Sequence, residues 1–162
     1  MAEGVERMNQ GFAFRRAAGA HLVHSSFFAV LAESRIQSDQ FDAAERLLTD
    51  GFTHIERSGE CHSKAELHRV QARYLLRTGL DVEAAVSRFE RAIEVARSQE
   101  ARLFELRATV DLAKVWQERG EDREALRLLA PICGWFSEGF AMKDLKEASA
   151  LLDQLRSTSG GA

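Results

Sequence analysis

Proline, cysteine and long apolar runs are all scarce in this chain. The single proline is Pro131, so uninterrupted helices are possible through almost the whole sequence. The two cysteines, Cys61 and Cys133, lie far apart and form no CxxC pair, which gives no sign of an oxidising compartment. The longest apolar run covers residues 27–32, well short of the roughly 20 residues that span a bilayer. Because the N-terminus also lacks a basic and apolar leader, we predict a cytoplasmic protein with no membrane partner.

A strong charge of one sign and the common catalytic motifs are also missing. The formal net charge of -3 gives no reason to expect nucleic acid as a partner. The phosphate-binding patterns GxxxxGKS and GxxxxGKT do not occur, nor do the GxSxG pattern of hydrolases and the HExxH pattern of zinc enzymes. We therefore predict that the chain is not an enzyme and has no catalytic residue, no cofactor and no metal site.

What the chain has instead is a pattern of small and large residues that recurs about every 40 residues. Alanine recurs at two positions, and a large apolar residue follows the second alanine. The aligned residues are Ala32, Ala72 and Ala113, then Ala44, Ala85 and Ala125, then Leu48, Phe89 and Leu129. Because alanine lets two helix backbones approach closely, we expect these alanines at helix crossings. A period of this length is typical of helical repeat arrays, whose units bury their apolar faces against each other.

The repeat predicts an all-α fold, a right-handed superhelical stack of antiparallel helix pairs with about eight helices. Abundant Ala, Leu, Glu and Arg favour helix over strand. We expect helices over residues 21–37, 41–57, 63–78, 82–98, 101–119 and 123–136. One domain, residues 1–156, would contain a half repeat (1–19), three repeats (20–59, 60–99 and 100–139) and a closing helix (144–156), followed by a disordered tail (157–162).

Residues at the expected helix ends support these boundaries. Ser63 with Glu66, and Asp144 with Glu147, have the spacing of a capping box, in which side chains bond the first free backbone amides. A residue that enters the left-handed region is expected where each first helix turns into the second. The aligned residues at this turn are Asp39, Gly79 and Gly120.

This spacing of small and large residues resembles the tetratricopeptide repeat, whose usual unit has about 34 residues. The longer period here implies extra helical turns, as in the long-helix variants of large bacterial signalling ATPases. The segments that look like that subgroup are residues 65–69, 89–97, 104–108, 128–140 and 144–148, with Leu151 and Leu152. The resemblance covers roughly residues 20–156. It departs from the pattern at Arg73, where a small or polar residue is usual, and at Ile132, where a small residue is usual.

The resemblance implies an interaction region of a larger protein. In that subgroup the repeats follow an ATPase module, often with a class III nucleotide cyclase or a DNA-binding domain at the far N-terminus. The chain would be the C-terminal repeat region of such a protein, or a stand-alone relative. Its function would be non-catalytic protein–protein interaction or scaffolding at the regulatory or sensor end. Two alternatives stay open: a self-association module, and a fragment of a nucleotide cyclase or ATPase that is active only with its missing domains.

Histidines are concentrated in the first half of the chain. A metal site would need three or four of them to converge, and their spacings match no known zinc pattern. We therefore interpret them as solvated or turn residues. They are His21, His24, His54, His62 and His68, and Cys61 adjoins one of them.

Cationic side chains on the first helices are the candidate binding residues, because these helices line the concave face of a stacked array. Arg69, Arg73 and Arg77 recur at every fourth position and so share one side of their helix. Planar guanidinium groups hold carboxylates in two-point contacts, which predicts an acidic peptide or a C-terminus as partner. We expect all three to be largely exposed. The full candidate set is Glu33, Gln37, Arg69, Arg73, Arg77, Arg107 and Lys114.

The N-terminal half repeat is the candidate self-association edge. It lacks a partner helix, so the apolar residues Val5, Met8 and Phe12 are expected to leave apolar surface exposed. Such a surface is typical of an interface. It would dock on upstream domains of a longer protein or on a second copy in a homodimer.

Overall fold

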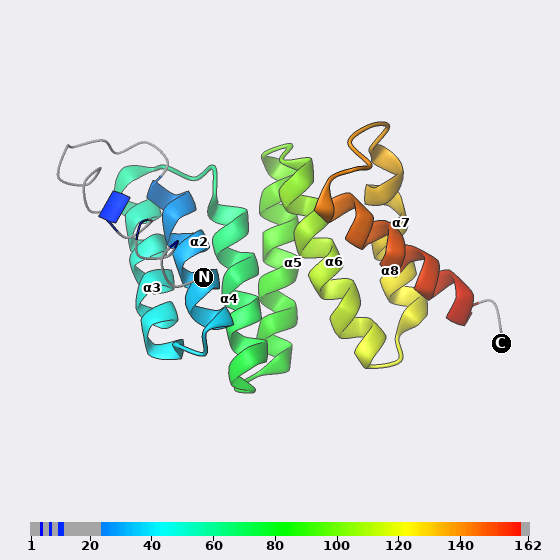
Figure 1. The fold of residues 1–162 in the computed structure, drawn as a ribbon, viewed down its shortest axis with the longest axis horizontal. Helices are drawn as coiled ribbons and strands as arrows, with labels where there is room; N and C mark the ends of the chain where they lie inside the picture. Colours follow the sequence, from blue (N-terminus) through cyan, green and yellow to red (C-terminus); the bar gives the residue numbers. More distant parts are fainter. Residues whose placement is uncertain (1–3, 5–6, 8–9, 12–23, 160–162) are drawn as a thin grey trace. The chain divides into compact units, whose positions relative to one another are not determined.

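The computed structural model describes residues 4, 7, 10, 11 and 24–159. These residues form seven helices and no strand (Figure 1). The helices are α2 (His24–Gln37), α3 (Phe41–Ser58), α4 (Lys64–Thr78), α5 (Val82–Ser98), α6 (Arg102–Glu118), α7 (Asp122–Trp135) and α8 (Lys143–Ser159). Their ends lie close to the expected ones, so the prediction of an all-α fold is confirmed. The superhelical stack and the total of about eight helices stay predictions.

The helices fall into two compact units, Met1–Ala85 and Val86–Ala162, and the division lies within α5. In the first unit α2 packs against α3 and α4, which also pack against each other (Figure 1). In the second unit α6 packs against α7 and α8, which again contact each other. Each unit thus contains a first helix, its second helix and the next first helix of the expected array.

The aligned alanines lie in the cores of both units. All six are completely buried, and the large residues that follow the second alanine of each pair, Leu48, Phe89 and Leu129, are buried as well. A methyl group occupies little space between two helices, so its burial indicates close backbone approach. The residue spacing therefore identified the core positions correctly. The alanines are Ala32, Ala44, Ala72, Ala85, Ala113 and Ala125.

At Gly51 in the first unit, the backbone of α3 lies close to side chains of both α2 and α4. It is buried in the middle of α3. A Cβ atom at this position would lie 2.9 Å from Leu67 Cδ2 and 3.0 Å from Phe28 Cβ. Only glycine leaves room for these two side chains, so α3 approaches both α2 and α4 here.

The turns between first and second helices have the expected left-handed backbone. Asp39 has φ of 55°, Gly79 of 66° and Gly120 of 77°. Asparagine, aspartate and glycine are the residues that tolerate this region best, so the aligned turn positions are confirmed.

The capping box predicted at Ser63 is wrong, whereas the one predicted at Asp144 stays a prediction. Ser63 precedes α4, but its hydroxyl bonds Ser26 Oγ at 2.7 Å and makes no bond to a free amide of its own helix. The Glu66 carboxylate accepts bonds from Arg69 instead. Asp144 lies inside α8, which begins at Lys143, and bonds Arg107. The carboxylates of Glu66 and Asp144 both bind arginines, because a charged guanidinium makes a stronger hydrogen bond to a carboxylate than a neutral amide does.

The expectations for the two ends of the chain have different outcomes. Val5, Met8 and Phe12 lie outside the described residues. The C-terminal helix α8 continues through Ser159, past residue 157 where the disordered tail was expected to begin. The hydroxyls of Ser157 and Thr158 donate hydrogen bonds to the backbone oxygen of Gln154, one turn earlier in the helix.

Within the described part of the chain, no helix combines the length and the apolar character that a bilayer crossing requires.

Thr109 provides a test of the packing of α6. Its side chain is completely buried, and its hydroxyl has no hydrogen-bond partner among the described residues. Valine has nearly the same shape and removes this unsatisfied group. We expect Thr109→Val to raise the free energy of unfolding by about 1 kcal/mol in urea titrations. Thr78→Val is the matched control, because the Thr78 hydroxyl bonds the Tyr74 backbone oxygen at 2.9 Å. Equal effects of the two changes would contradict this assignment.

Candidate interaction site

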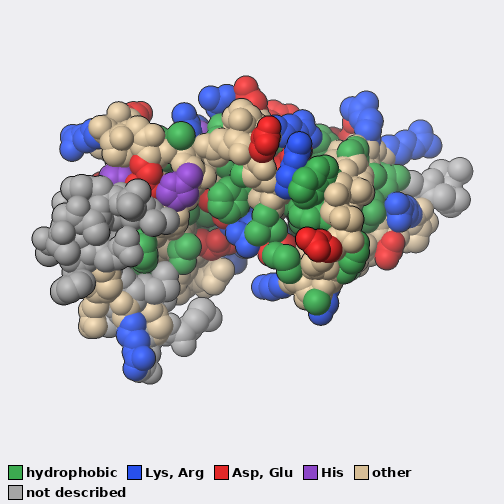
Figure 2. Space-filling view, turned by 90° about the horizontal axis from the view of Figure 1, so that it is seen from above, with side chains coloured by type: hydrophobic (Ala, Val, Ile, Leu, Met, Phe, Trp, Pro, Cys, Tyr) green, Lys and Arg blue, Asp and Glu red, His purple; other side chains and the backbone are tan. Residues whose placement is uncertain are grey.

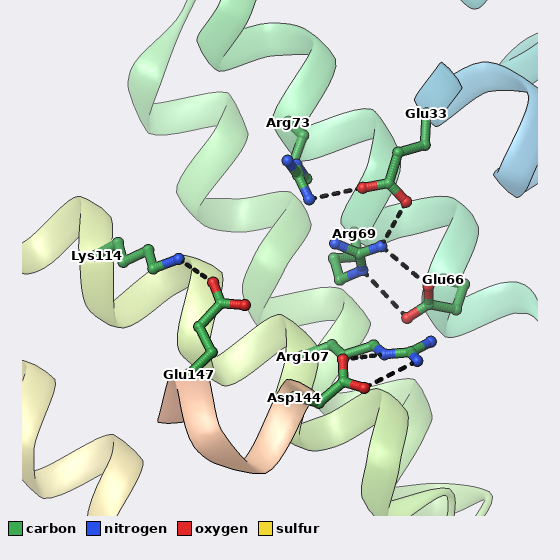
Figure 3. Close-up of polar contacts among 8 residues, drawn as sticks. All are labelled: Glu33, Glu66, Arg69, Arg73, Arg107, Lys114, Asp144 and Glu147. Atoms are coloured by element: carbon green, nitrogen blue, oxygen red, sulfur yellow. Dashed lines mark hydrogen bonds and ion pairs between the residues drawn. The ribbon is translucent and has the colours of Figure 1, made fainter. Parts of the chain in front are cut away.

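In the first unit two residues of the predicted arginine stripe (Arg69, Arg73 and Arg77) bind one carboxylate, that of Glu33 on α2. Glu33 Oε2 lies 2.9 Å from Arg69 Nη2, and Glu33 Oε1 lies 2.6 Å from Arg73 Nη1 (Figure 3). Arg69 also bonds both oxygens of Glu66, at 3.1 Å each. The four side chains form a continuous network that joins α2 to α4.

The expectation that Arg69 is exposed is wrong, because only 5% of the residue is accessible. A lone guanidinium would be costly to bury, but two carboxylates compensate it here. Arg73 is half-buried, and Arg77 is exposed. Arg77 Nη2 pairs with Asp39 Oδ1 at 2.6 Å, between two side chains that are both more than half accessible. Gln37, at the end of α2, is exposed.

In the second unit the two remaining candidate cations also pair with a neighbouring first helix. Arg107 Nε and Nη2 lie 2.7 and 3.2 Å from the two oxygens of Asp144, a bidentate contact (Figure 3). Lys114 pairs with Glu147. Both acids belong to α8, and both cations belong to α6. The two ion pairs therefore join α6 to α8.

All five candidate cations thus have a carboxylate partner outside their own helix. The acidic partners lie 33 to 40 residues away, about one repeat along the chain. Acidic and basic side chains both occur on the face seen in Figure 2. An acidic ligand would have to displace these internal carboxylates.

Arg69→Met tests the network in the first unit. The change removes the buried guanidinium that binds both Glu33 and Glu66, so we expect it to lower the free energy of unfolding by about 3 kcal/mol in urea titrations. Arg77→Met removes an exposed pair and should cost less than about 1 kcal/mol. If Arg69→Met costs no more than this control, the network does not stabilise the unit.

A second polar cluster, which the sequence analysis missed, surrounds Glu60 in the turn between α3 and α4. Glu60 Oε1 accepts hydrogen bonds from the backbone amide and the hydroxyl of the buried Ser25, at 3.2 and 2.8 Å. Glu60 Oε2 lies 3.0 Å from His54 Nε2, and Glu60 Oε1 lies 3.3 Å from His62 Nδ1. The carboxylate therefore satisfies an amide in the first turn of α2, a site where negative charge is favourable.

The contacts of Ser26 extend this cluster. Ser26 Oγ lies 3.0 Å from His62 Nε2, which gives a hydroxyl, an imidazole and a carboxylate in sequence. Such a series can pass a proton, but acyl transfer also needs backbone donors aimed at the developing oxyanion. None of the hydrogen bonds among the described residues places such a donor beside Ser26 Oγ. The bonds of Ser25 and Ser26 instead tie the start of α2 to the turn before α4, so we assign the cluster a structural role.

The pKa of Glu60 gives this role a measurable signature. Burial raises the pKa, but the hydrogen bonds from His54 and Ser25 and the charge of His62 outweigh burial and hold it below the ordinary value of 4.5. The ionised carboxylate therefore stabilises the fold above pH 4.5, and this contribution is lost as the pH falls through the lower folded-state pKa.

We expect the difference in unfolding free energy between wild type and Glu60→Gln to be constant near pH 5 and to shrink toward pH 3. His54, His62 and Ser25 are unchanged in both proteins. Urea titrations at each pH measure the difference. Glu56→Gln, a change at an exposed carboxylate of α3, should show no such trend. A Glu60→Gln difference that stays constant down to pH 3 would refute the assignment.

Histidine, cysteine and acidic side chains do not converge on a metal position in the described part of the chain. Cys61 is exposed and Cys133 is half-buried. Burial raises the pKa of the Cys133 thiol, with a smaller opposing effect of Arg156, so its reactive thiolate form is disfavoured.

A groove of about 360 Å³ lies between α6 and α8 in the second unit. One wall is a single face of α6, and the other wall is a single face of α8. Leu151, which is buried in the core, contributes apolar surface, while the remaining residues are polar or small. Lys114, one of the candidate binding residues, pairs with Glu147 across the two walls. The lining residues are Lys114, Gln117, Glu118, Glu147, Ala150, Leu151 and Gln154.

No protein-family model matches the sequence, and no curated protein is similar to it. The resemblance to the tetratricopeptide repeat therefore depends on the residue spacing alone.

Proposed function

We propose that the chain is a non-catalytic protein-interaction module of the tetratricopeptide type that binds an extended peptide segment of its partner. Its setting would be the regulatory or sensor end of a larger ATPase-containing signalling protein in the cytoplasm. The spacing of small residues supports the assignment to this repeat class. The groove between α6 and α8 supports the role in binding.

The groove is the observation that carries this proposal. Its volume of about 360 Å³ falls within the roughly 300–1,000 Å³ of typical ligand sites. It lies between two first helices, which are the helices expected to line the binding face of such an array. The Lys114–Glu147 pair joins its two walls, and the core residue Leu151 fixes the position of α8. A pre-formed groove of this kind lowers the conformational cost of binding.

A degenerate pool of fluorescein-labelled octapeptides tests this function by fluorescence anisotropy. Ala150 lines the groove and its side chain is exposed, so Ala150→Trp should fill the groove without disturbing the core. We expect the wild type to bind the pool and Ala150→Trp to bind it at least about tenfold more weakly, because a filled groove excludes the peptide.

Ser149→Trp is the matched control, since Ser149 is also a small, exposed residue of α8 but does not line the groove. The melting temperature of both variants should equal that of the wild type. Equal binding by wild type and Ala150→Trp would show that the groove is not the binding site.

A further inference from the structure

The charges of the groove between α6 and α8 are not balanced. Lys114 is matched by Glu147 within the groove. Glu118 also lines the groove, is exposed, and has no ion-pair or hydrogen-bond partner for its carboxylate among the described residues. One negative charge therefore remains available to a ligand.

The position of Glu118 on its helix makes this charge unfavourable in the free protein. Glu118 is the final residue of α6, and the last turn of α6 contains no basic residue. The C-terminus of a helix carries partial negative charge, so a carboxylate there is repelled and a cation is attracted. Arg119 follows at the C-cap, but it does not line the groove. A cation bound in the groove would be attracted by both negative charges and would reduce the repulsion between the Glu118 carboxylate and the C-terminus of α6.

Two side-chain amides face this groove from opposite walls. Gln117 comes from α6 and Gln154 from α8, and neither side chain has a hydrogen-bond partner among the described residues. An amide both donates and accepts, as a peptide group does. The pair is therefore suited to the main chain of an extended segment.

We infer that the groove selects an extended peptide segment that carries a lysine or arginine, whose cation contacts Glu118 while Gln117 and Gln154 bond the peptide main chain. This inference rests on the proposed peptide-binding function and names the class of its partner. It is the opposite of the acidic partner expected from the arginine stripe. An acidic segment would have to displace Glu147 from Lys114 and would meet the like charge of Glu118, which disfavours it.

Three fluorescein-labelled octapeptide pools test the inference. They are degenerate except at one central position, which is fixed as arginine, serine or glutamate. We expect the arginine pool to bind the full-length chain about 5- to 10-fold more tightly than the serine pool, and the glutamate pool to bind most weakly. The preference should shrink in 0.5 M salt, where the Debye length is only about 4 Å.

Variants of Glu118 test whether this residue causes the preference for the arginine pool. Glu118→Gln should lower the affinity for the arginine pool to that for the serine pool, and Glu118→Lys should make the glutamate pool the tightest. Glu90→Gln is the matched control, because Glu90 is an exposed carboxylate of α5 that does not line the groove. It should leave the order of the three pools unchanged.

The outcomes separate this inference from the proposed function. If Ala150→Trp weakens binding but Glu118→Gln leaves the preference for arginine intact, the groove binds peptides and the role of Glu118 is wrong. A wild type that prefers the serine or glutamate pool leads to the same conclusion. If no pool binds, or if Ala150→Trp has no effect, both the inference and the proposed function are overturned.

Discussion

The buried ion-pair network of Arg69 is the interaction on which the first unit depends most. Arg69 is only 5% accessible, and its charge is tolerable there because Glu33 and Glu66 supply carboxylates at hydrogen-bond distance. Glu33 belongs to α2 and Arg69 to α4, so the network fixes how these helices pack. The buried Ala32 and Ala72 allow the same helices to approach closely. Close approach brings the charges together, and we expect the charges in turn to specify the register of the two helices.

The helices and the core were predictable from the sequence, whereas the partners of the charges were not. Helix boundaries follow from local signals such as the positive-φ turn at Gly79, and core positions follow from the recurrence of alanine. The pairing of Arg107 with Asp144 depends on which helices are neighbours, and on side-chain geometry across 37 residues of sequence. A comparison of charges one repeat apart would have suggested Glu33 with Arg73, since both directly follow an aligned alanine. Nothing comparable points to Glu60, which lies in a turn and meets Ser25 only in the folded chain.

Neutralisation of the arginine stripe changes which residues are available for binding. Cations that pair with carboxylates of a neighbouring helix stabilise the helix packing and contribute little net charge to a ligand. What remains at the groove between α6 and α8 is one unmatched carboxylate, two amides and a small apolar surface. A repeat array can therefore use most of its charged residues for its own packing, and only a few unpaired groups then decide which partner it binds.

The central claim is that the charges on the first helices bind each other and thereby hold the helices in register. A double-mutant cycle between Glu33 and Arg69 tests it most directly, with Glu33→Gln, Arg69→Met and the double variant unfolded in urea. The account predicts a coupling free energy of more than about 1.5 kcal/mol, the range of residues in one buried network. A coupling below about 0.5 kcal/mol, as for an exposed pair, would contradict it.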